Sequence, residues 1–202
     1  MAYFIGKYRI FTPQEILKLY MYAEKPVSKL EYLFYVTLGA RYNEGQEILK
    51  HPEWFDPNTR IIHFQSNKTW DRELIYKDRY IFLSYNDVVN VHNYLVSNKT
   101  HIINPKYGNL TRNMNNWAKN DTSIFSSGIG VHCLRLTRFA WLLQTFPDYT
   151  NAILESMDYN PTKHYKIDMN DAKIEEFRNV PFTEHEKSHI KATLFGWSAA
   201  PS

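Results

Sequence analysis

Residues 132–146 read His-Cys-Leu-Arg-Leu-Thr-Arg-Phe-Ala-Trp-Leu-Leu-Gln-Thr-Phe. From Leu134 to Phe146 apolar side chains fall on nearly every side of a helix, which is typical of a helix buried in the core of a domain. His132 and Arg135 are one helical turn apart at its start. The stretch therefore predicts a buried helix that begins at a pair of basic residues, which is either a surface pair or part of a functional site.

Helical patterns flank this stretch on both sides. The sequence Thr-Pro-Gln-Glu at 12–15 supplies a capping oxygen, a proline at the first helical position and a carboxylate that reaches back to the cap. Ser28 and Glu31 repeat the capping pattern for a second helix, and Gly39 is a natural stop just before Arg41. Further helices are expected over residues 43–51, 84–96, 111–119, 151–157 with Asp148 as its cap, and 171–194 with an interruption at Pro181.

Short aromatic and β-branched runs occupy the middle of the chain. The runs at 61–64, 72–76 and 80–83 predict a small three-stranded antiparallel sheet. Residues 66–71 are polar and are expected to form a turn that carries Lys68. The expected fold class is therefore α+β, mainly α-helical with a small antiparallel β-sheet.

The composition is that of one globular domain. The 202 residues are 44% hydrophobic and 22% charged, which excludes the disordered, collagen-like and coiled-coil classes. A chain of this length buries a sizeable core without disulfides or metals. The net charge of +3 is compatible with nucleic-acid binding, but many enzymes share such a charge. Basic residues gather in two groups along the sequence: Lys68, Arg72, Lys77 and Arg79, and then Arg112, Lys119, Arg135 and Arg138.

Cysteine content and hydropathy indicate an intracellular protein. Cys133 is the single cysteine and cannot form an internal disulfide. The sequence shows no signal-peptide pattern and no run of about 18 apolar residues. We therefore expect the cytoplasm or nucleoid of a host cell as its location, and no membrane as a partner.

Five chemically distinctive residues follow one another in a recognisable order. Arg41 lies in Leu-Gly-Ala-Arg-Tyr-Asn-Glu, Lys68 in the expected hairpin turn, His132 and Arg135 in His-Cys-Leu-Arg, and Tyr165 after Asn-Pro-Thr-Lys-His. In this order and context the chain resembles the catalytic domain of the tyrosine recombinases, the family of phage and archaeal virus integrases. The Thr-Pro-Gln-Glu opening resembles the usual first helix of that domain, and the resemblance covers about residues 12–169.

The resemblance implies a site-specific recombinase or integrase that cleaves and rejoins DNA through a 3′-phosphotyrosine on Tyr165. The Asn, Tyr and Lys content suggests an integrase of an archaeal virus or plasmid. Arg41 and Arg135 would bind the phosphate, because guanidinium is always charged and presents a planar donor fork. His132 would take the phenolic proton, and Lys68 would protonate the leaving 5′ oxygen. The phosphotyrosine keeps the energy of the broken bond, so the resemblance implies neither a nucleotide cofactor nor a metal.

One position departs from the family pattern. Nine residues before Tyr165, where the family usually has histidine or tryptophan, this sequence has Ser156. A serine hydroxyl donates one hydrogen bond, so Ser156 is retained as an uncertain catalytic residue. A small shift of the alignment places Met157 or Asp158 there instead.

Rival assignments stay open for the nucleophile and for the second arginine. Tyr159 is the nearest rival to Tyr165, and Tyr149 is a distant one. Arg138 forms an overlapping Arg-x-x-Arg with Arg135 and defines an alternative register. The spacing onward to the tyrosine favours Arg135.

The resemblance also implies partners and domain organisation. The substrate would be double-stranded DNA, bound mainly through its phosphates. Family members act as tetramers on DNA, and we expect a monomer or weak oligomer when the protein is free. We expect a single catalytic domain over 1–202, with a core over about 12–169, a C-terminal helical tail over 170–195 that is able to pass to a neighbouring subunit, and no N-terminal core-binding domain.

Three other functions remain open. A DNA-relaxing enzyme of the type IB topoisomerase kind shares the chemistry, and a non-catalytic DNA-binding protein on a decayed recombinase fold is suggested by Ser156. His185-Glu186-Lys187-Ser188-His189 matches the His-Glu-x-x-His motif of zinc metalloproteases. Against zinc, Lys187 is charged where such helices are apolar, and no residue after His189 is of a type that supplies a third ligand.

Overall fold

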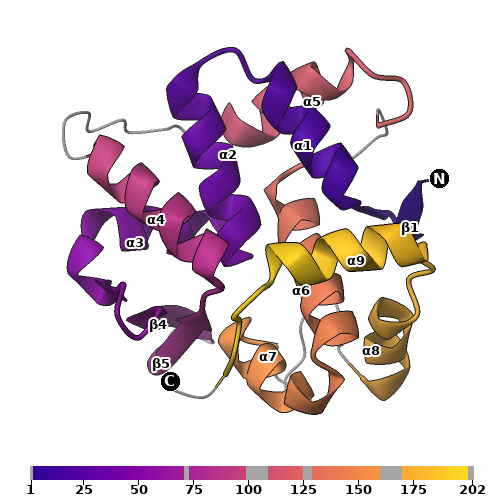
Figure 1. Ribbon diagram of the computed structural model, residues 1–202. Helices are drawn as coiled ribbons and strands as arrows, with labels where there is room; N and C mark the ends of the chain where they lie inside the picture. The colour runs from indigo at the N-terminus through magenta and orange to yellow at the C-terminus, as the bar shows by residue number, and fades with distance from the viewer. Residues whose placement is uncertain (1, 71–72, 99–108, 125–128, 160–169, 200–202) are drawn as a thin grey trace.

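A computed structural model gives the structure of residues 2–70, 73–98, 109–124, 129–159 and 170–199, with the side chains of 66–70, 73–77 and 97–98 left undescribed. The described residues are mainly helical and include small antiparallel sheets (Figure 1), as the predicted fold class requires. The helices are α1 (Pro13–Tyr22), α2 (Pro26–Leu38), α3 (Tyr42–Lys50), α4 (Tyr85–Asn98), α5 (Asn109–Ala118), α6 (Val131–Thr145), α7 (Thr150–Ser156), α8 (Asp171–Arg178) and α9 (Glu184–Thr193), with 3₁₀ turns η1 (Pro52–Trp54) and η2 (Pro147–Tyr149). The strands are β1 (Tyr3–Ile5), β2 (Tyr8–Ile10), β3 (Phe55–Asp56), β4 (Ile61–Trp70) and β5 (Glu73–Phe82).

Helix α6 lies at the centre of the molecule. Every side chain from Cys133 to Leu143 is buried, so the prediction of a buried helix is confirmed. The segment between β2 and α1 is fastened to this helix by two hydrogen bonds: the Phe11 backbone N–H donates to Thr137 Oγ1 (2.9 Å), and Trp141 Nε1 donates to the Phe11 carbonyl (3.1 Å). Helix α9 crosses α6 in Figure 1, so the two ends of the described chain pack on the same central helix.

The predicted helix boundaries are correct at the start of α1 and at the end of α2, and wrong at the start of α2. The capping box of α1 is present, with Thr12 Oγ1 accepting from the Glu15 N–H (3.2 Å). Helix α2 instead begins at Pro26, without a side-chain cap, and Glu31 is buried rather than capping. Gly39 ends α2 in the left-handed region (φ 57°), and a Cβ there would lie 2.9 Å from Met157 Cε, so both its backbone angle and its surroundings require glycine.

The remaining helix predictions are close, with one difference at a helix start. Asp148 lies inside the turn η2 rather than capping α7, whose N-cap is Tyr149. The predicted interruption of the tail at Pro181 is confirmed: it separates α8 from α9, and Thr183 and Glu186 form a capping box that starts α9. Among the described residues, none of the helices has the length and apolarity needed to cross a lipid bilayer.

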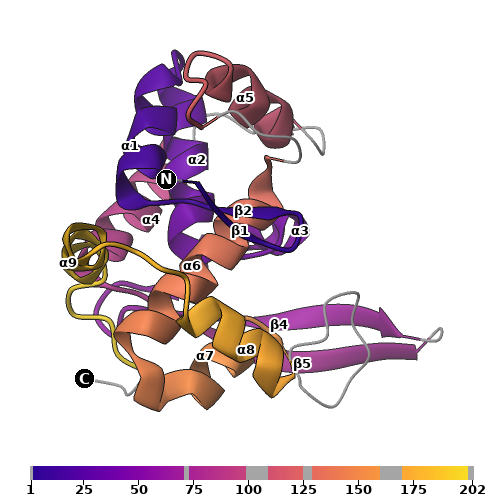
Figure 2. The same cartoon turned by 90° about the vertical axis from the view of Figure 1, so that its right-hand side faces the viewer.

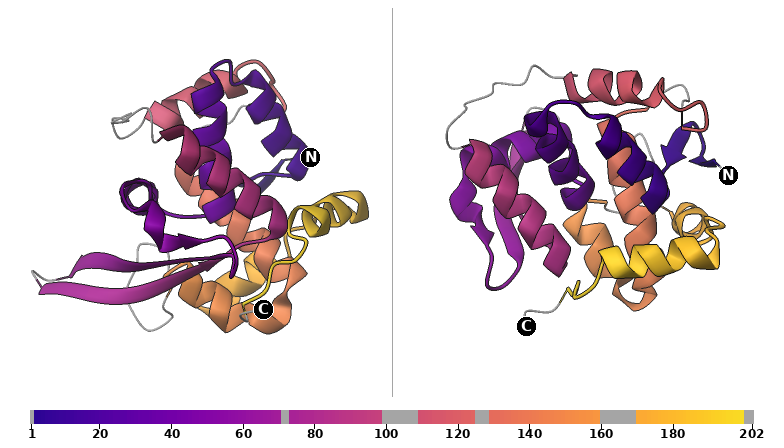
Figure 3. Two further views of the ribbon diagram at one scale, coloured as in Figure 1. Left: turned by 60° about the vertical axis from the view of Figure 1, so that its left-hand side comes forward. Right: turned by 45° about the horizontal axis from the view of Figure 1, so that its top comes forward.

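The three-stranded sheet exists, but its strands differ from the prediction. Strands β4 and β5 pair without interruption from Ile61↔Phe82 to Trp70↔Glu73, so residues 66–70 of the predicted turn belong to a strand. The third strand is β3, which precedes β4, and the β1–β2 sheet was not predicted. Figures 2 and 3 show the β4–β5 hairpin projecting well beyond the helices. The polar run at 66–69 lacks the apolar alternation by which strands are recognised in a sequence, which is why it is read as a turn.

The buried carboxyl of Glu31 predicts a pH-dependent stability. Its Oε1 has no hydrogen-bond partner among the described residues, and burial raises its pKa to about 7. Since the folded-state pKa lies above the ordinary value of about 4.3, the folded state loses stability as the pH rises from about 4.5 to about 7. Glu31→Gln is therefore expected to raise the free energy of unfolding by about 2 kcal/mol at pH 8 and to change it little at pH 4.

Urea denaturation at pH 4, 6 and 8 measures this effect. The matched control is Glu47→Gln, because the Glu47 side chain is 51% exposed, and its stability difference should not change with pH. An equal stability difference for Glu31→Gln at pH 4 and pH 8 would contradict the raised pKa.

Candidate active site

Arg41 stands at the junction between α2 and α3, where it is the N-cap residue of α3. Its backbone N–H donates to Glu44 Oε2 (2.8 Å), and its Nη1 lies 2.6 Å from Glu44 Oε1 and 3.0 Å from Asp158 Oδ2. The Arg41 side chain is 35% exposed, so part of it faces solvent. The left-handed Gly39 turns the chain sharply at the end of α2, and this turn brings Arg41 to the site.

Arg135 lies one turn into α6 and is buried. Its Nη1 donates to the Gly39 carbonyl (2.8 Å), its Nη2 donates to the Met157 carbonyl, and its Nε donates to the Tyr159 hydroxyl (3.2 Å). Glu44 Oε2 lies 3.8 Å from the same Nη1. Arg135 therefore ties together the ends of α2 and α7, and it shares Glu44 with Arg41.

Arg79 of β5 is a third guanidinium at this place, and it is not among the site residues predicted from the sequence. It is 1% exposed, its Nη1 pairs with Glu44 Oε1, its Nη2 donates to the Ser156 carbonyl, and its guanidinium lies 5.1 Å from the Phe64 ring centroid. The alternating pattern of β5 could have indicated Arg79 as a site residue. Arg79 has the same strand parity as the core residue Ile81, so a charged residue occupies a core-facing position.

Glu44 is the carboxylate around which the three guanidiniums gather. Burial alone would raise its pKa, but Arg79, Arg135 and Arg41 outweigh that effect and lower its pKa to about 2. With Asp158, the cluster holds two carboxylates against three guanidiniums. The cluster therefore carries an excess of positive charge.

His132, in the first turn of α6, lies beside this cluster. His132 is exposed, and its ring packs edge-on against Tyr8 with centroids 4.7 Å apart. Partial burial, together with the cations Arg135, Arg41 and Lys7, lowers its pKa to about 4. The imidazole is therefore neutral at pH 7.

Ser156 does not face the cluster with its hydroxyl, contrary to its proposed place in the site. Its Oγ donates to the Ile153 carbonyl (2.9 Å) one turn earlier in α7. Tyr159 is placed there instead: its hydroxyl accepts from Arg135 Nε, and its ring lies 4.7 Å from that guanidinium. Asp158, at φ 51°, redirects the chain after α7. For this reason, counting residues along the sequence suggests Tyr159 only as a rival nucleophile and not as the partner of Arg135.

Two other predicted site residues are only partly located. Lys68 lies in β4 opposite Ile75 rather than in the turn, and its side chain is not described. Its backbone is four residues beyond Phe64, the partner of Arg79, or about 13 Å further along the strand. Tyr165 lies outside the described residues.

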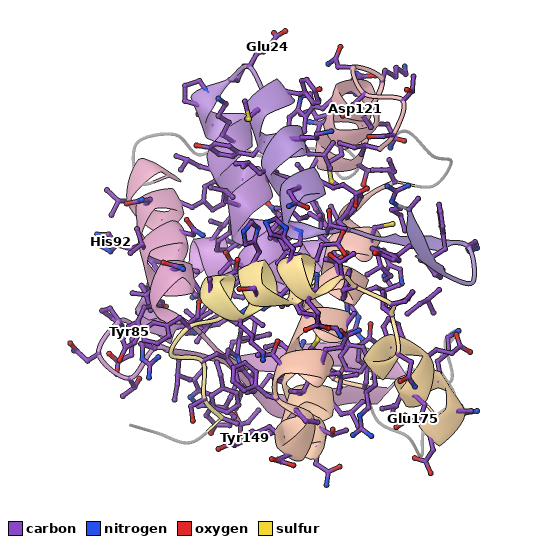
Figure 4. All side chains as sticks on the ribbon, turned by 45° about the vertical axis from the view of Figure 1, so that its right-hand side comes forward. Glu24, Tyr85, His92, Asp121, Tyr149 and Glu175 are labelled. Carbon is purple, nitrogen blue, oxygen red and sulfur yellow. The ribbon has the colours of Figure 1, made fainter. Side chains whose placement is uncertain are left out.

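The rival candidates Arg138 and Tyr149 both lie away from the arginine cluster. Arg138 is buried and pairs with Asp87 of α4 through both terminal nitrogens, one of them at 3.3 Å, so it joins α6 to α4 rather than facing the cluster. Tyr149 follows the far end of α6, about 20 Å from His132 at the helical rise of about 1.5 Å per residue. Figure 4 shows Tyr149 at the opposite end of the molecule from Glu24.

The His-Glu-x-x-His motif lies on α9, far from the arginine cluster in sequence and with other contacts. Glu186 is buried, accepts from the Tyr3 hydroxyl (2.9 Å) and from the Thr183 N–H (2.7 Å), and caps the helix. The rings of His185 and His189 lie 4.2 Å apart. Over the described parts of the chain, no three His, Cys, Asp or Glu side chains come together as a possible metal site.

The arrangement is suited to an anion. Arg41 presents a partly exposed guanidinium, and His132 is a neutral imidazole within the electrostatic influence of Arg41 and Arg135. Arg79 and Arg135 are buried cations that share Glu44 with Arg41. Such a set binds and polarises a phosphate-sized ligand. No protein-family model matches the chain, and no curated protein and no solved structure shows significant similarity to it.

Proposed function

We propose that this chain is the catalytic domain of a site-specific DNA recombinase or integrase that cleaves and rejoins duplex DNA through a 3′-phosphotyrosine on Tyr165. The observation that carries the proposal is the convergence of Arg41 and Arg135, far apart in the sequence, on one carboxylate beside His132. The order of these residues along the chain is that of the tyrosine recombinases, which supports the same assignment.

The charge of the cluster fits the chemistry of a phosphodiester. A DNA phosphate is anionic, and nucleophilic attack adds charge to its non-bridging oxygens. Guanidinium stabilises that charge because it is permanently cationic and donates along two parallel N–H bonds. Arg41 meets the phosphate through its exposed part, while the buried Arg135 holds the surrounding backbone in place and adds its field.

The proton transfers use His132 and Lys68. The Tyr165 oxygen forms a bond to phosphorus as the phenolic proton moves to the neutral His132 imidazole. The bond from phosphorus to the 5′ oxygen breaks, and the leaving oxygen takes a proton from the Lys68 ammonium. Rejoining is the reverse, in which a 5′ hydroxyl attacks the phosphotyrosine and the phenol is released. No nucleotide cofactor or metal takes part in these steps.

The partners and location follow from this activity. The substrate is double-stranded DNA, strand exchange takes place in a homotetramer on DNA, and the free protein is a monomer or weak oligomer. The site of action is the interior of the host cell, where the DNA is.

A suicide-substrate assay tests the proposal. A library of duplexes, randomised around a nick that lets the 5′-hydroxyl fragment diffuse away, is incubated with the chain in excess chelator. A protein–DNA adduct that survives denaturant is expected. Duplex binding without any adduct across the library would refute cleavage and leave a DNA-binding protein, whereas plasmid relaxation without strand exchange would indicate a topoisomerase.

Arg41 is the residue whose loss most directly measures phosphate stabilisation. Arg41→Ala is expected to slow single-turnover adduct formation by about 100- to 1,000-fold, and Arg41→Lys should restore only part of the rate because it lacks the donor fork. The control is Lys50→Ala, an exposed residue of the same helix, which should keep the wild-type rate. An Arg41→Ala chain that is folded and as fast as wild type would contradict the role of Arg41.

A further inference from the structure

The β1–β2 hairpin is firmly held against the rest of the molecule. The Tyr3 hydroxyl donates to Glu186 of α9 (2.9 Å), and Arg9, 2% exposed, pairs with Glu15 of α1 and donates to the Ser123 carbonyl (3.1 Å). Ile10 is fully buried against the core. These contacts on both strands fix the position of the turn between them.

That turn places Lys7 at the candidate site. Gly6 has a φ of 57° and open space around it, which allows the tight reversal. Lys7 is exposed, and its Nζ lies 5.5 Å from the centroid of the Tyr8 ring. The same Tyr8 ring packs against His132 at 4.7 Å, so Lys7 and His132 share one aromatic ring.

The surroundings leave the ammonium of Lys7 uncompensated. In the portion of the chain that the structure describes, no carboxylate pairs with Lys7. The Tyr8 ring lies against both Lys7 and His132. The charges of Arg135, Arg41 and Lys7 all contribute to the low pKa of His132, so Lys7 adds to the same positive field as the arginine cluster. In Figure 2 the turn of this hairpin points to the same side of the molecule as the β4–β5 hairpin. An exposed cation on a fixed turn, beside a cationic site, indicates a second place for an anion.

We propose that Lys7 binds a backbone phosphate of the DNA, next to the phosphate that Arg41 holds. This inference rests on the proposed function and adds the β1–β2 turn to the substrate-binding surface. Duplex DNA carries one charge for about every 3.4 Å of helix axis in each strand, so a strand that presents one phosphate to Arg41 brings others close by. Phosphate contacts of this kind fix the register of the DNA without reading its sequence.

Equilibrium binding to a fluorescent duplex, at salt concentrations from about 50 to 200 mM, tests this contact. Lys7→Ala is expected to weaken binding about fivefold and to reduce the slope of log affinity against log salt by about one, while Lys7→Arg keeps both. The matched control is Lys25→Ala, which removes the same charge from an exposed position beside Glu24, at the end of the molecule shown in Figure 4. Lys25→Ala should change neither quantity.

A second substrate separates phosphate binding from proton donation. When sulfur replaces the leaving 5′ oxygen, the thiolate departs without a general acid, because a thiol has a much lower pKa than an alcohol. Adduct formation by Lys68→Ala should then be rescued, and that by Lys7→Ala should not. Rescue of Lys7→Ala would make Lys7 the general acid and overturn its assignment as a phosphate contact.

The outcomes distinguish this inference from the proposed function. If the wild-type chain binds duplex and forms the adduct, but Lys7→Ala has the same affinity and salt slope, the Lys7 contact is refuted and the recombinase proposal stands. If the wild-type chain neither binds duplex nor forms an adduct, the proposed function itself fails and the Lys7 contact fails with it.

Discussion

Tyr165→Phe is expected to abolish the covalent protein–DNA adduct completely. The phenolic oxygen is the atom that bonds to phosphorus, and phenylalanine keeps the ring while removing that oxygen. Because the cationic groups at Arg41, Arg135 and Lys7 remain, the affinity for duplex DNA should stay within about twofold of wild type. Denaturing gels with the suicide duplex measure the adduct, and fluorescence anisotropy measures binding.

Two other tyrosines provide controls. Tyr149→Phe alters a ring that is 41% exposed, beyond the far end of α6, and should leave the adduct unchanged. Tyr159→Phe removes the acceptor of the Arg135 Nε bond, so it should lower stability by about 1–3 kcal/mol and slow the reaction without abolishing it. An adduct that persists in Tyr165→Phe and disappears in Tyr159→Phe would transfer the nucleophile to Tyr159.

Glu44→Gln is expected to destabilise the fold by about 3–5 kcal/mol, the usual cost of removing one partner from a buried ion pair. The glutamate contacts Arg41, Arg79 and Arg135, and its neutralisation leaves three guanidiniums facing the carboxylate of Asp158. Urea denaturation at pH 7 measures the loss. A difference below about 1 kcal/mol would show that the cluster does not depend on this charge.

The pH dependence of this difference provides an internal check. The pKa of Glu44 is about 2 in the folded state, below its ordinary value of about 4.3. Its ionised form therefore stabilises the fold at every pH above about 4.3, and this contribution is lost as the pH falls toward 2. The gap between wild type and Glu44→Gln should be constant from pH 8 to pH 5 and shrink below that. The exposed Glu47→Gln should stay within about 0.5 kcal/mol of wild type throughout.

Local sequence patterns predicted the parts of the fold that local interactions determine. The buried helix α6 follows from its continuous apolar pattern, the start of α1 from its capping box, and the end of α2 from Gly39. The β4–β5 hairpin differs from the prediction because the polar residues 66–69 favour a turn, whereas they continue strand β4 in a hairpin that projects beyond the helices (Figure 3). The β1–β2 sheet was missed because strands of three residues are too short to show an alternating pattern.

The candidate site was predicted in part, and its missing members are those placed by tertiary structure. The convergence of Arg41 and Arg135 was expected from the family resemblance, and they share Glu44. The register of β5 directs Arg79 toward the site, and the left-handed Asp158 at the end of α7 brings Tyr159 there. Lys7 is placed at the site by a hairpin that is bonded to α1 and α9. None of these three placements depends on a motif that can be read along the sequence.

Identification of the residue that carries the DNA tests the central claim most directly. The adduct from the suicide-substrate assay is digested with trypsin and nuclease, and mass spectrometry locates the nucleotide remnant on the peptides. We expect a 3′-linked nucleotide on the tyrosine at position 165 and on no other residue. A remnant on Tyr159, Tyr149 or a serine, or an adduct joined to the 5′ end of the DNA, would contradict the account.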